Sequence, residues 1–286
     1  MPELAYVNGV YGPIHEAKVS IEDRGFQFGD GIYEVVVAYQ GRPWLLDAHL
    51  QRMRRSAQAI ELAYDFDAHP IAPIIVEGLR RSGLSDALIY IQLTRGAAPR
   101  SHLIPDDIVP TLVMTFRPLV PIPDELRNRG ARIITVPDTR WANCFIKSVM
   151  LLPNVLARHE ARRRGFDDAL FVTETGEVRE CTSSNIFLAR NRRLLFPPRT
   201  HAVLHGCTQG FLLECAASIE LPVEEDVITL DTLLSANEVF ISSTSVDVLG
   251  VTQINTQVIG DGRVGPLTRK LYQTFHDKKQ TACSLE

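Results

Sequence analysis

Lys147 is the residue whose surroundings best suit it to chemistry, because it is a single lysine within an apolar segment. It lies in Trp141–Leu156, WANCFIKSVMLLPNVL, where no other charged residue stands within six positions on either side. Burial among apolar neighbours disfavours an ammonium ion, so the pKa of such a lysine falls and its amine becomes a nucleophile for an aldehyde. The alternative is a lysine whose stem lies across the core while its ammonium group reaches water.

Three other polar groups could take part in binding or catalysis. Arg100 and His102 stand two positions apart in the loop 95–105, RGAAPRSHLIP, so an extended backbone would direct both side chains to one side. A solvated loop is the alternative. Residues 206–209 open a predicted helix, and unpaired backbone N–H groups at a helix N-terminus favour an anion. Residues 242–245 form a run of four hydroxyl side chains, SSTS.

The composition is that of an ordinary globular protein and excludes several classes. Of 286 residues, 45% are hydrophobic and 22% charged, the net charge is −4, and the pI is about 6.1. This balance gives no footprint for nucleic acid or an anionic membrane. No apolar run is long enough for a membrane span, and the N-terminus lacks signal-peptide character, so a cytoplasmic location is expected.

The cysteines and histidines do not predict a metal site or a disulfide framework. Five cysteines are scattered without CxxC spacing, and the eight histidines include no HExxH motif. The cysteines are therefore expected to be reduced, and no metal is predicted.

The elements that must position these groups alternate between strands and helices in both halves of the chain. In the first half, Asn8-Gly9 predicts a hairpin turn, and Gln40-Gly41 another. The cluster Arg52, Arg54 and Arg55 predicts an exposed basic helix face, or one arginine turned inward toward an anion. The predicted helices are His49–Leu62 and Pro70–Ser82, and the predicted strands are Ile32–Tyr39, Arg42–Leu46, Ala87–Thr94 and Thr111–Phe116.

A proline-rich segment, RPLVPIP from Arg117, resists helix and central strand and predicts a boundary between two domains. We expect an α+β fold with a small N-terminal domain (1–117), a linker (118–130) and a larger, strand-rich C-terminal domain (131–286). The second half contains the following predicted helices and strands: Asn154–Arg164, Cys207–Ala217, Val264–Phe275, Ala131–Val136, Ala169–Thr173, Val178–Arg179, Ser184–Ala189 and Glu238–Ser242. The polar end after Asp277 is expected to be loose.

Four stretches carry a resemblance to a known family: RGFQFGDGIYE, TRGAAPRSH, RW…IKS…NVLA and VRECTSSNIF. In this order they resemble the class IV pyridoxal-phosphate aminotransferases, which have fold type IV, and most closely the D-amino-acid transaminases. The resemblance extends from about Asn8 to Phe275. It implies a two-domain fold of the D-amino-acid aminotransferase type and pyridoxal 5′-phosphate as cofactor.

The resemblance assigns the reacting groups. Lys147 matches the lysine that bonds to the cofactor aldehyde and moves the proton, and Glu180 matches the carboxylate beneath the pyridine nitrogen. By itself, Glu180 could be an ordinary glutamate at a strand end. Leu204 matches a side chain that packs on the ring, and Ser183 is implied to contact the cofactor.

Phosphate binding is assigned to three places in the chain. Arg52 matches an arginine of the first helix that faces the phosphate. Cys207 and Thr208 match donors at a helix N-terminus, and Ser243 and Thr244 match a further hydroxyl contact.

Tyr33, Arg100 and His102 match the residues that hold the substrate α-carboxylate in D-amino-acid transaminases. In that family the arginine–histidine loop comes from the neighbouring subunit, so the resemblance implies a homodimer with shared active sites. The sequence departs from relatives at Trp141–Phe145, at Cys181-Thr182 and at Cys207. These departures leave the substrate range open.

The leading functional hypothesis is a transaminase that moves an amino group between a D-amino acid, such as D-alanine, and 2-oxoglutarate by a ping-pong mechanism. Two alternatives share the fold: an (R)-amine or branched-chain L-amino-acid transaminase, and a lyase that resembles aminodeoxychorismate lyase. A non-catalytic binder of pyridoxal phosphate would not need both Lys147 and Glu180.

Overall fold

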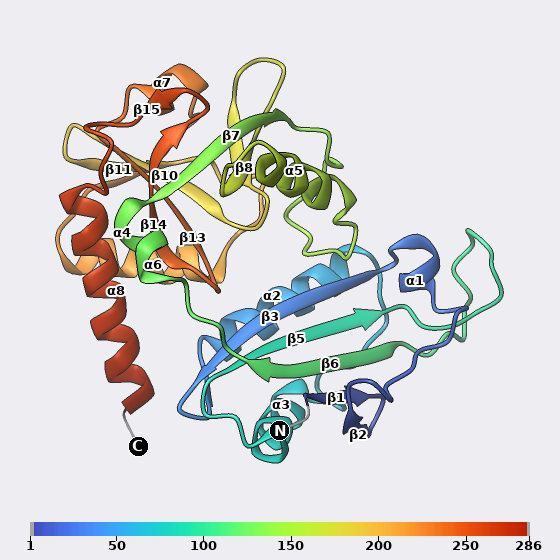
Figure 1. Cartoon of the computed structure of the whole chain (residues 1–286). Coiled ribbons are helices and arrows are strands. Elements are labelled where there is room, and N and C mark those ends of the chain that lie inside the picture. The colour runs from blue at the N-terminus through green and yellow to red at the C-terminus, as the bar shows by residue number, and fades with distance from the viewer. Residues whose placement is uncertain (1–2, 285–286) are drawn as a thin grey trace. The chain divides into compact units, whose positions relative to one another are not determined.

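The computed structural model describes residues 3–284 and divides into two compact units, each built on its own sheet (Figure 1). Unit 1 contains the chain up to Val120 together with Ile146–Met150, and unit 2 contains Pro121–Phe145 and the chain from Leu151 onward. The first two and last two positions of the predicted domains lie outside the described residues. The mixed α+β architecture predicted from the sequence is confirmed.

Unit 1 is an antiparallel six-stranded sheet in the order β2-β1-β6-β5-β3-β4. Its strands are β1 (Leu4–Val7), β2 (Val10–Pro13), β3 (Gly31–Tyr39), β4 (Arg42–Pro43), β5 (Ala87–Thr94) and β6 (Thr111–Pro118). Its helices are α1 (Arg24–Phe28), α2 (Leu46–Ala59) and α3 (Ile71–Ser82). Both predicted hairpin turns are present, with positive φ at Asn8, Gly9, Gln40 and Gly41.

One face of this sheet is buried beneath helices, because alternate strand residues point to opposite sides. Along β5, Ala87, Ile89, Ile91 and Leu93 are fully buried, whereas the residues between them are partly exposed. Helix α2 packs on β3, and α3 packs on β1 and β6. Each residue of β3 therefore faces either the helix layer or the opposite surface of the sheet.

Two predictions in this unit are wrong in detail. Arg42–Leu46 is not a strand throughout, because only Arg42 and Pro43 pair with β3 and Leu46 already begins α2. The predicted start of that helix at His49 is therefore one turn late. The glycine-rich stretch before β3 contains the short helix α1, which Asp23 caps through the Gly25 N–H and which Gly29 ends with φ +70°.

Unit 2 is built on a nine-stranded mixed sheet, in which eight strands follow the order β12-β11-β10-β13-β14-β7-β8-β9 and β15 pairs with β14. The strands are β7 (Ala131–Pro137), β8 (Asp168–Val172), β9 (Val178–Cys181), β10 (Asn185–Arg190), β11 (Arg193–Phe196), β12 (Val223–Glu225), β13 (Glu238–Ser243), β14 (Asp247–Ile254) and β15 (Gln257–Val258). The helices are α4 (Asp124–Arg129), α5 (Leu152–Arg163), α6 (Cys207–Ser218), α7 (Leu230–Leu234) and α8 (Pro266–Ser284).

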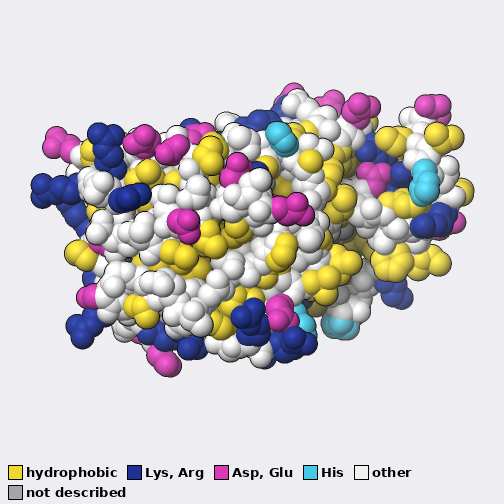
Figure 2. Space-filling model, turned by 90° about the horizontal axis from the view of Figure 1, so that it is seen from above, with side chains coloured by type: hydrophobic (Ala, Val, Ile, Leu, Met, Phe, Trp, Pro, Cys, Tyr) yellow, Lys and Arg dark blue, Asp and Glu magenta, His cyan; other side chains and the backbone are white. Residues whose placement is uncertain are grey.

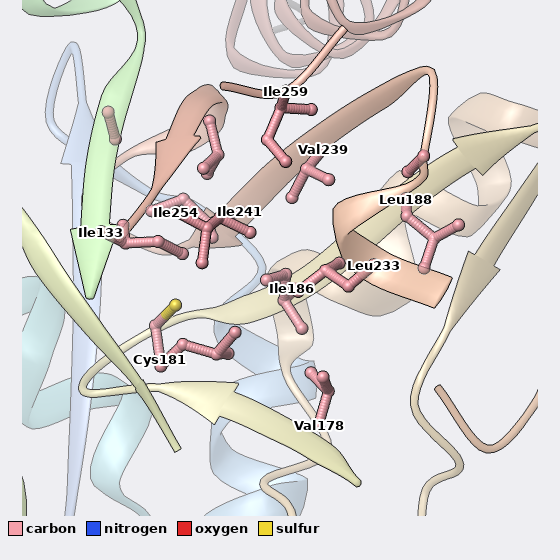
Figure 3. Close-up of a cluster of buried hydrophobic side chains, with 14 of the residues drawn as sticks. Ile133, Val178, Cys181, Ile186, Leu188, Leu233, Val239, Ile241, Ile254 and Ile259 are labelled. Atoms are coloured by element: carbon pink, nitrogen blue, oxygen red, sulfur yellow. The ribbon is translucent and has the colours of Figure 1, made fainter. Parts of the chain in front are cut away.

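Apolar side chains cover both faces of this sheet. One buried cluster joins β7, β10, β13 and β14 to α7, with Ile133, Ile186, Ile241 and Leu233 among its members (Figure 3). A second cluster joins the other face of β13 and β14 to α6 and α8 through Phe240, Val248 and Phe275. Burial on both faces explains why these strands read as continuous apolar runs in the sequence.

Two segments of unit 2 differ from the sequence-based expectation. Part of the predicted linker 118–130 forms the helix α4, whose first turn carries Asp124 and Glu125, which suit a helix N-terminus. The chain after Asp277 is not loose, because α8 continues to Ser284, with Lys279 and Cys283 buried. The prediction was wrong because it considered only the polar composition of this segment. The buried Lys279 forms an ion pair with Asp247, which lies far from it in the sequence.

All five cysteines lie within residues 3–284, and none of them forms a disulfide. Burial raises the pKa of Cys144 and Cys215 to about 11, so both remain protonated thiols at neutral pH. The described part of the chain has no cluster of three metal-ligating side chains. His201 and His205 have HxxxH spacing, which in a helix would place both imidazoles on one face. They lie in an irregular segment, where this spacing does not bring the two side chains to the same side.

Among residues 3–284, no helix combines the length and apolar character needed to cross a membrane. On the face shown in Figure 2, basic and acidic side chains are interspersed.

Candidate active site

The segment that carries Lys147 is held against β3 by main-chain hydrogen bonds. The Tyr33 N–H donates to the Lys147 carbonyl at 2.9 Å, and the Val149 N–H donates to the Gly31 carbonyl at 3.1 Å. From the helix layer, the Ser56 hydroxyl accepts from the Lys147 N–H at 3.2 Å. Residues 146–150 therefore belong to unit 1, although the predicted boundary put them in the C-terminal domain.

This pairing brings the lysine onto a tyrosine ring. Lys147 is half-buried, and its Nζ lies 4.3 Å from the centroid of the Tyr33 ring, a cation–π contact. Tyr33 in turn stacks on Tyr90 at 5.7 Å, and burial together with Tyr33 raises the pKa of Tyr90 to about 12. Two of the predicted site residues, Lys147 and Tyr33, are thus in direct contact.

Arg52 is turned inward from the basic face of α2, which the sequence left as one of two possibilities. Its guanidinium donates to both carboxylate oxygens of Glu34, at 2.7 and 2.8 Å, and His49 Nδ1 lies 2.8 Å from the same carboxylate. Burial alone would raise the pKa of Glu34, but Arg52 and His49 outweigh it and hold that pKa at about 2. Glu34 therefore stays ionised and fixes the orientation of Arg52.

In unit 2, Glu180 receives several hydrogen bonds at the end of β9. Arg140 Nη1 donates to its Oε1 at 2.5 Å, Asn185 Nδ2 donates at 3.3 Å, and the Leu204 N–H donates to both oxygens at 3.2 Å. Arg140 is itself held by both oxygens of Asp138 at 2.9 Å. Burial would lower the pKa of Arg140, but Asp138 and Glu180 keep it above its ordinary value, so the guanidinium remains charged.

Asn185 connects Glu180 to the helix α6. Its amide also donates to the Leu204 carbonyl at 2.8 Å, and a Cβ at Gly206 would lie 2.2 Å from its Oδ1. Only glycine fits at this N-cap. In the first turn of α6 the backbone N–H groups of Cys207 and Thr208 have no acceptor within the helix, so this end suits an anion.

The remaining unit 2 residues lie at neighbouring strand ends. Asn185 pairs across the sheet with Ser242, directly before Ser243 and Thr244, which are half-buried at the end of β13. Ser183 is exposed in the turn between β9 and β10.

Arg100 and His102 are exposed and lie against one aromatic ring. The Arg100 guanidinium is 4.5 Å from the Phe28 centroid, and the His102 ring centroid is 5.6 Å from it. The two side chains thus share one side of the loop, as the spacing predicts. Lys147 and Tyr33 lie together elsewhere in unit 1.

A buried network fixes the course of this loop. Asp30 accepts from Arg24 at 2.8 Å and from Arg95 at 2.8 Å, while the Arg24 guanidinium also donates to the Ser101 carbonyl at 2.6 Å. Burial would raise the pKa of Asp30, but Arg95 and Arg24 lower it, so the carboxylate is ionised between two cations. The loop is therefore tied on both sides of Arg100 to the N-terminus of β3.

Several supporting residues were not found from the sequence. Arg24, Asp30, Glu34, Arg140 and Asn185 appeared only as letters of quoted motifs, and His49 only as the first residue of a predicted helix; none has a recognisable spacing relative to its partner. The one available signal was charge in an apolar context, because a charged residue is rarely buried without a partner.

Together these groups are of the kinds that a phosphorylated pyridine aldehyde requires. They provide an amine over an aromatic ring, a carboxylate that accepts a hydrogen bond from a guanidinium group, an arginine, and a helix N-terminus. An enzyme of the pyridoxal-phosphate type is thereby indicated by the fold and the donor groups.

Comparison with known proteins supports an enzyme of the pyridoxal-phosphate type. Residues 31–254 match the family described as amino-transferase class IV. A D-alanine aminotransferase from Staphylococcus haemolyticus is 37% identical over 273 residues, which cover 95% of this chain and 96% of the relative.

Two solved structures share the fold. The branched-chain amino acid aminotransferase of Escherichia coli has a TM-score of 0.88 at 22% identity, with 97% of this chain and 94% of that chain covered. A second branched-chain amino acid aminotransferase, solved with pyridoxamine 5′-phosphate, has a TM-score of 0.87 at 24% identity, with 98% and 95% covered. The chain belongs to the class IV aminotransferases and is a pyridoxal-phosphate-dependent transaminase.

Proposed function

We propose that this transaminase moves the amino group of a D-amino acid, such as D-alanine, to 2-oxoglutarate in two half-reactions. The observation that supports it most is the pair Arg100 and His102 on the Phe28 ring, in a loop fixed by Arg24, Asp30 and Arg95. A guanidinium binds a carboxylate through two hydrogen bonds, and the imidazole adds a third donor. The 37% identity to a D-alanine aminotransferase supports the same substrate class.

The proposed roles follow from the chemistry of each group. Bound pyridoxal phosphate supplies an aldehyde for amines and a ring that takes up the electron pair released at the substrate α-carbon. Lys147 would move the proton from the substrate α-carbon to the aldehyde carbon of the cofactor, and the pairing of its segment with β3 keeps its Nζ 4.3 Å from the centroid of the Tyr33 ring. Glu180, which accepts a hydrogen bond from the Arg140 guanidinium, would hold a proton at the pyridine nitrogen.

Phosphate binding is proposed for Arg52, for the N–H groups and hydroxyl at Cys207 and Thr208, and for the hydroxyls of Ser243 and Thr244. Leu204 would pack on the ring, and Ser183 would add a polar contact.

We also infer a homodimer in which the loop of Arg100 and His102 serves the site of the other subunit. The loop and α1 expose apolar side chains that a monomer would leave in water: Phe26 is 74% exposed, Leu103 80% and Val109 77%. Exposed apolar patches of this kind mark interaction surfaces.

The decisive experiment is a visible absorbance spectrum of the purified holoprotein before and after addition of D-alanine, L-leucine or an (R)-amine. D-alanine alone should bleach the cofactor band and release pyruvate, and 2-oxoglutarate should restore the band. Bleaching by L-leucine or by the amine would move the function to the branched-chain or amine alternative. Release of pyruvate from aminodeoxychorismate without an amino acceptor would identify a lyase.

A further inference from the structure

We propose that Lys279, on the C-terminal helix α8, is a positioning residue that sets how tightly the enzyme holds the phosphate of its cofactor. It acts on the turn between β13 and β14, which carries Ser243 and Thr244. The inference rests on the proposed phosphate role of those two hydroxyl groups, and it adds a residue far along the chain to that site.

The turn has a conformation that needs support. Ser243 and Asp247 are opposite each other where β13 and β14 meet, and the Val246 N–H donates to the Ser243 carbonyl at 3.2 Å. Asp247, which closes the turn, has a φ of +57°. Left-handed backbone is uncommon outside glycine, although Asp tolerates it better than most residues. A small change at Asp247 would therefore move the backbone that carries the hydroxyl groups.

Lys279 supplies that support through one short ion pair. Its Nζ donates to Asp247 Oδ2 at 2.6 Å, and the lysine is only 6% exposed. Few lysines are buried to this extent, because the ammonium group loses its hydration unless a partner replaces water. The same Nζ lies 5.7 Å from the centroid of the Phe275 ring.

The helix that carries Lys279 is itself fixed in register. Leu271 and Phe275 precede it by eight and four residues on the same helix face, and both are fully buried. They pack in one cluster with Phe240 of β13 and Val248 of β14. The ammonium group is thus presented to Asp247 from a rigid support that packs on the two strands flanking the turn.

Lys278, the neighbouring residue, provides a matched control. It has the same charge and length, but its Nζ makes only a 3.5 Å hydrogen bond to the Glu214 carbonyl on α6. Because this contact does not involve the turn between β13 and β14, removal of the Lys278 charge should leave that turn unchanged.

The test compares affinity for pyridoxal 5′-phosphate with affinity for pyridoxal, which lacks the phosphate. Both ligands are titrated by absorbance into the full-length chain after cofactor removal, for the wild type, Lys279→Met, Lys279→Arg and Lys278→Met. We expect Lys279→Met to weaken pyridoxal 5′-phosphate binding by about tenfold, the effect of losing one charge-assisted positioning contact. Binding of pyridoxal should change little. Lys279→Arg should restore most of the preference, and Lys278→Met should behave as the wild type.

Equal weakening of both ligands by Lys279→Met, or no weakening of either, would overturn the proposal. If Lys279→Met does not fold, Asp247→Asn decides, because Asn also tolerates a positive φ but cannot form the ion pair; it must lose the same preference. A wild-type protein without any preference for the phosphorylated ligand would remove the phosphate role of Ser243 and Thr244 as well. The D-amino-acid assignment is tested separately by the spectrum with D-alanine.

Discussion

Lys147 shows how the chemistry of one side chain depends on its backbone. A lysine in an apolar run could extend to solvent, but the segment pairs with β3 and Ser56, and this fixes Nζ over Tyr33. We expect Lys147→Ala to lower transaminase turnover by about 10³-fold or more, because both the covalent link to the cofactor and the acid–base group are lost. Steady-state rates with D-alanine, together with the visible absorbance band, measure this. Lys18→Ala, at an exposed lysine, is the control, and a normal rate in Lys147→Ala would exclude the assigned role.

The candidate site residues could be predicted from the sequence where a motif contains them. The residues that hydrogen-bond to them could not. The sequence indicated Lys147 because it is the single charged residue of an apolar segment, and Arg100 with His102 because they stand two positions apart. Both signals come from residues that are neighbours along the chain. Arg140 and Asn185 hold Glu180 from positions 40 residues before it and 5 residues after it, by hydrogen bonds that exist only in the folded sheet, where β9 pairs with β8 and β10 pairs with β13. Such contacts leave no periodic signal.

At the scale of elements, helix α2 is docked on β3 through a buried charge cluster. Glu34 is fully buried, and its ion pair with Arg52 and its contact with His49 join the two elements. The folded-state pKa of about 2 lies below the ordinary value of 4.5, so the stabilisation is complete above pH 4.5 and is lost as the pH falls toward 2. The sequence left open whether this helix has an exposed basic face or one arginine turned inward, because it gave no indication that a glutamate on a strand would face α2.

We predict that Glu34→Gln is destabilised by about 3 kcal/mol or more at pH 7, because it leaves Arg52 buried without its counter-charge. Its free energy of unfolding should also depend less on pH than that of the wild type between about pH 5 and pH 3. Urea unfolding at a series of pH values measures both effects.

Glu77 provides the contrast. Hydrogen bonds from Arg80 and Arg81 also lower its pKa to about 2, but these groups lie on the surface. Water and salt screen such pairs, so Glu77→Gln should leave the stability nearly unchanged. Equal effects of the two substitutions would show that burial does not decide the strength of the Glu34 cluster.

At the scale of the whole molecule, the residues assigned to one cofactor come from both compact units. Among the residues proposed to bind the cofactor, Lys147 and Arg52 belong to unit 1, whereas Glu180, Thr208 and the others belong to unit 2. The sequence predicted the two-part α+β fold and those strands that have a clear apolar pattern, but it missed β11, β12, β14 and β15 of the second sheet. It could not predict that 146–150 pair with β3, since that depends on hydrogen bonds across more than a hundred residues.

The proposed shared site makes a prediction that no single subunit could satisfy. Lys147→Ala and Arg100→Ala should each have little activity toward D-alanine as pure proteins. In a mixed dimer, one of the two sites would combine an intact Lys147 with the partner subunit's Arg100. Dissociation and random reassociation of equal amounts should therefore return about a quarter of the wild-type sites, since half of the dimers are mixed and each has one intact site.

The assay is the initial rate of pyruvate formation from D-alanine and 2-oxoglutarate, before and after reassociation of the mixture. The control is a mixture of Lys147→Ala with Lys147→Met. Neither subunit then has an intact Lys147, so no mixed dimer can contain a complete site. If the mixture of Lys147→Ala and Arg100→Ala forms dimers but gains no activity, Arg100 acts in its own subunit. In that case the exposed apolar side chains of α1 and the loop would have to be explained by contacts that do not complete an active site.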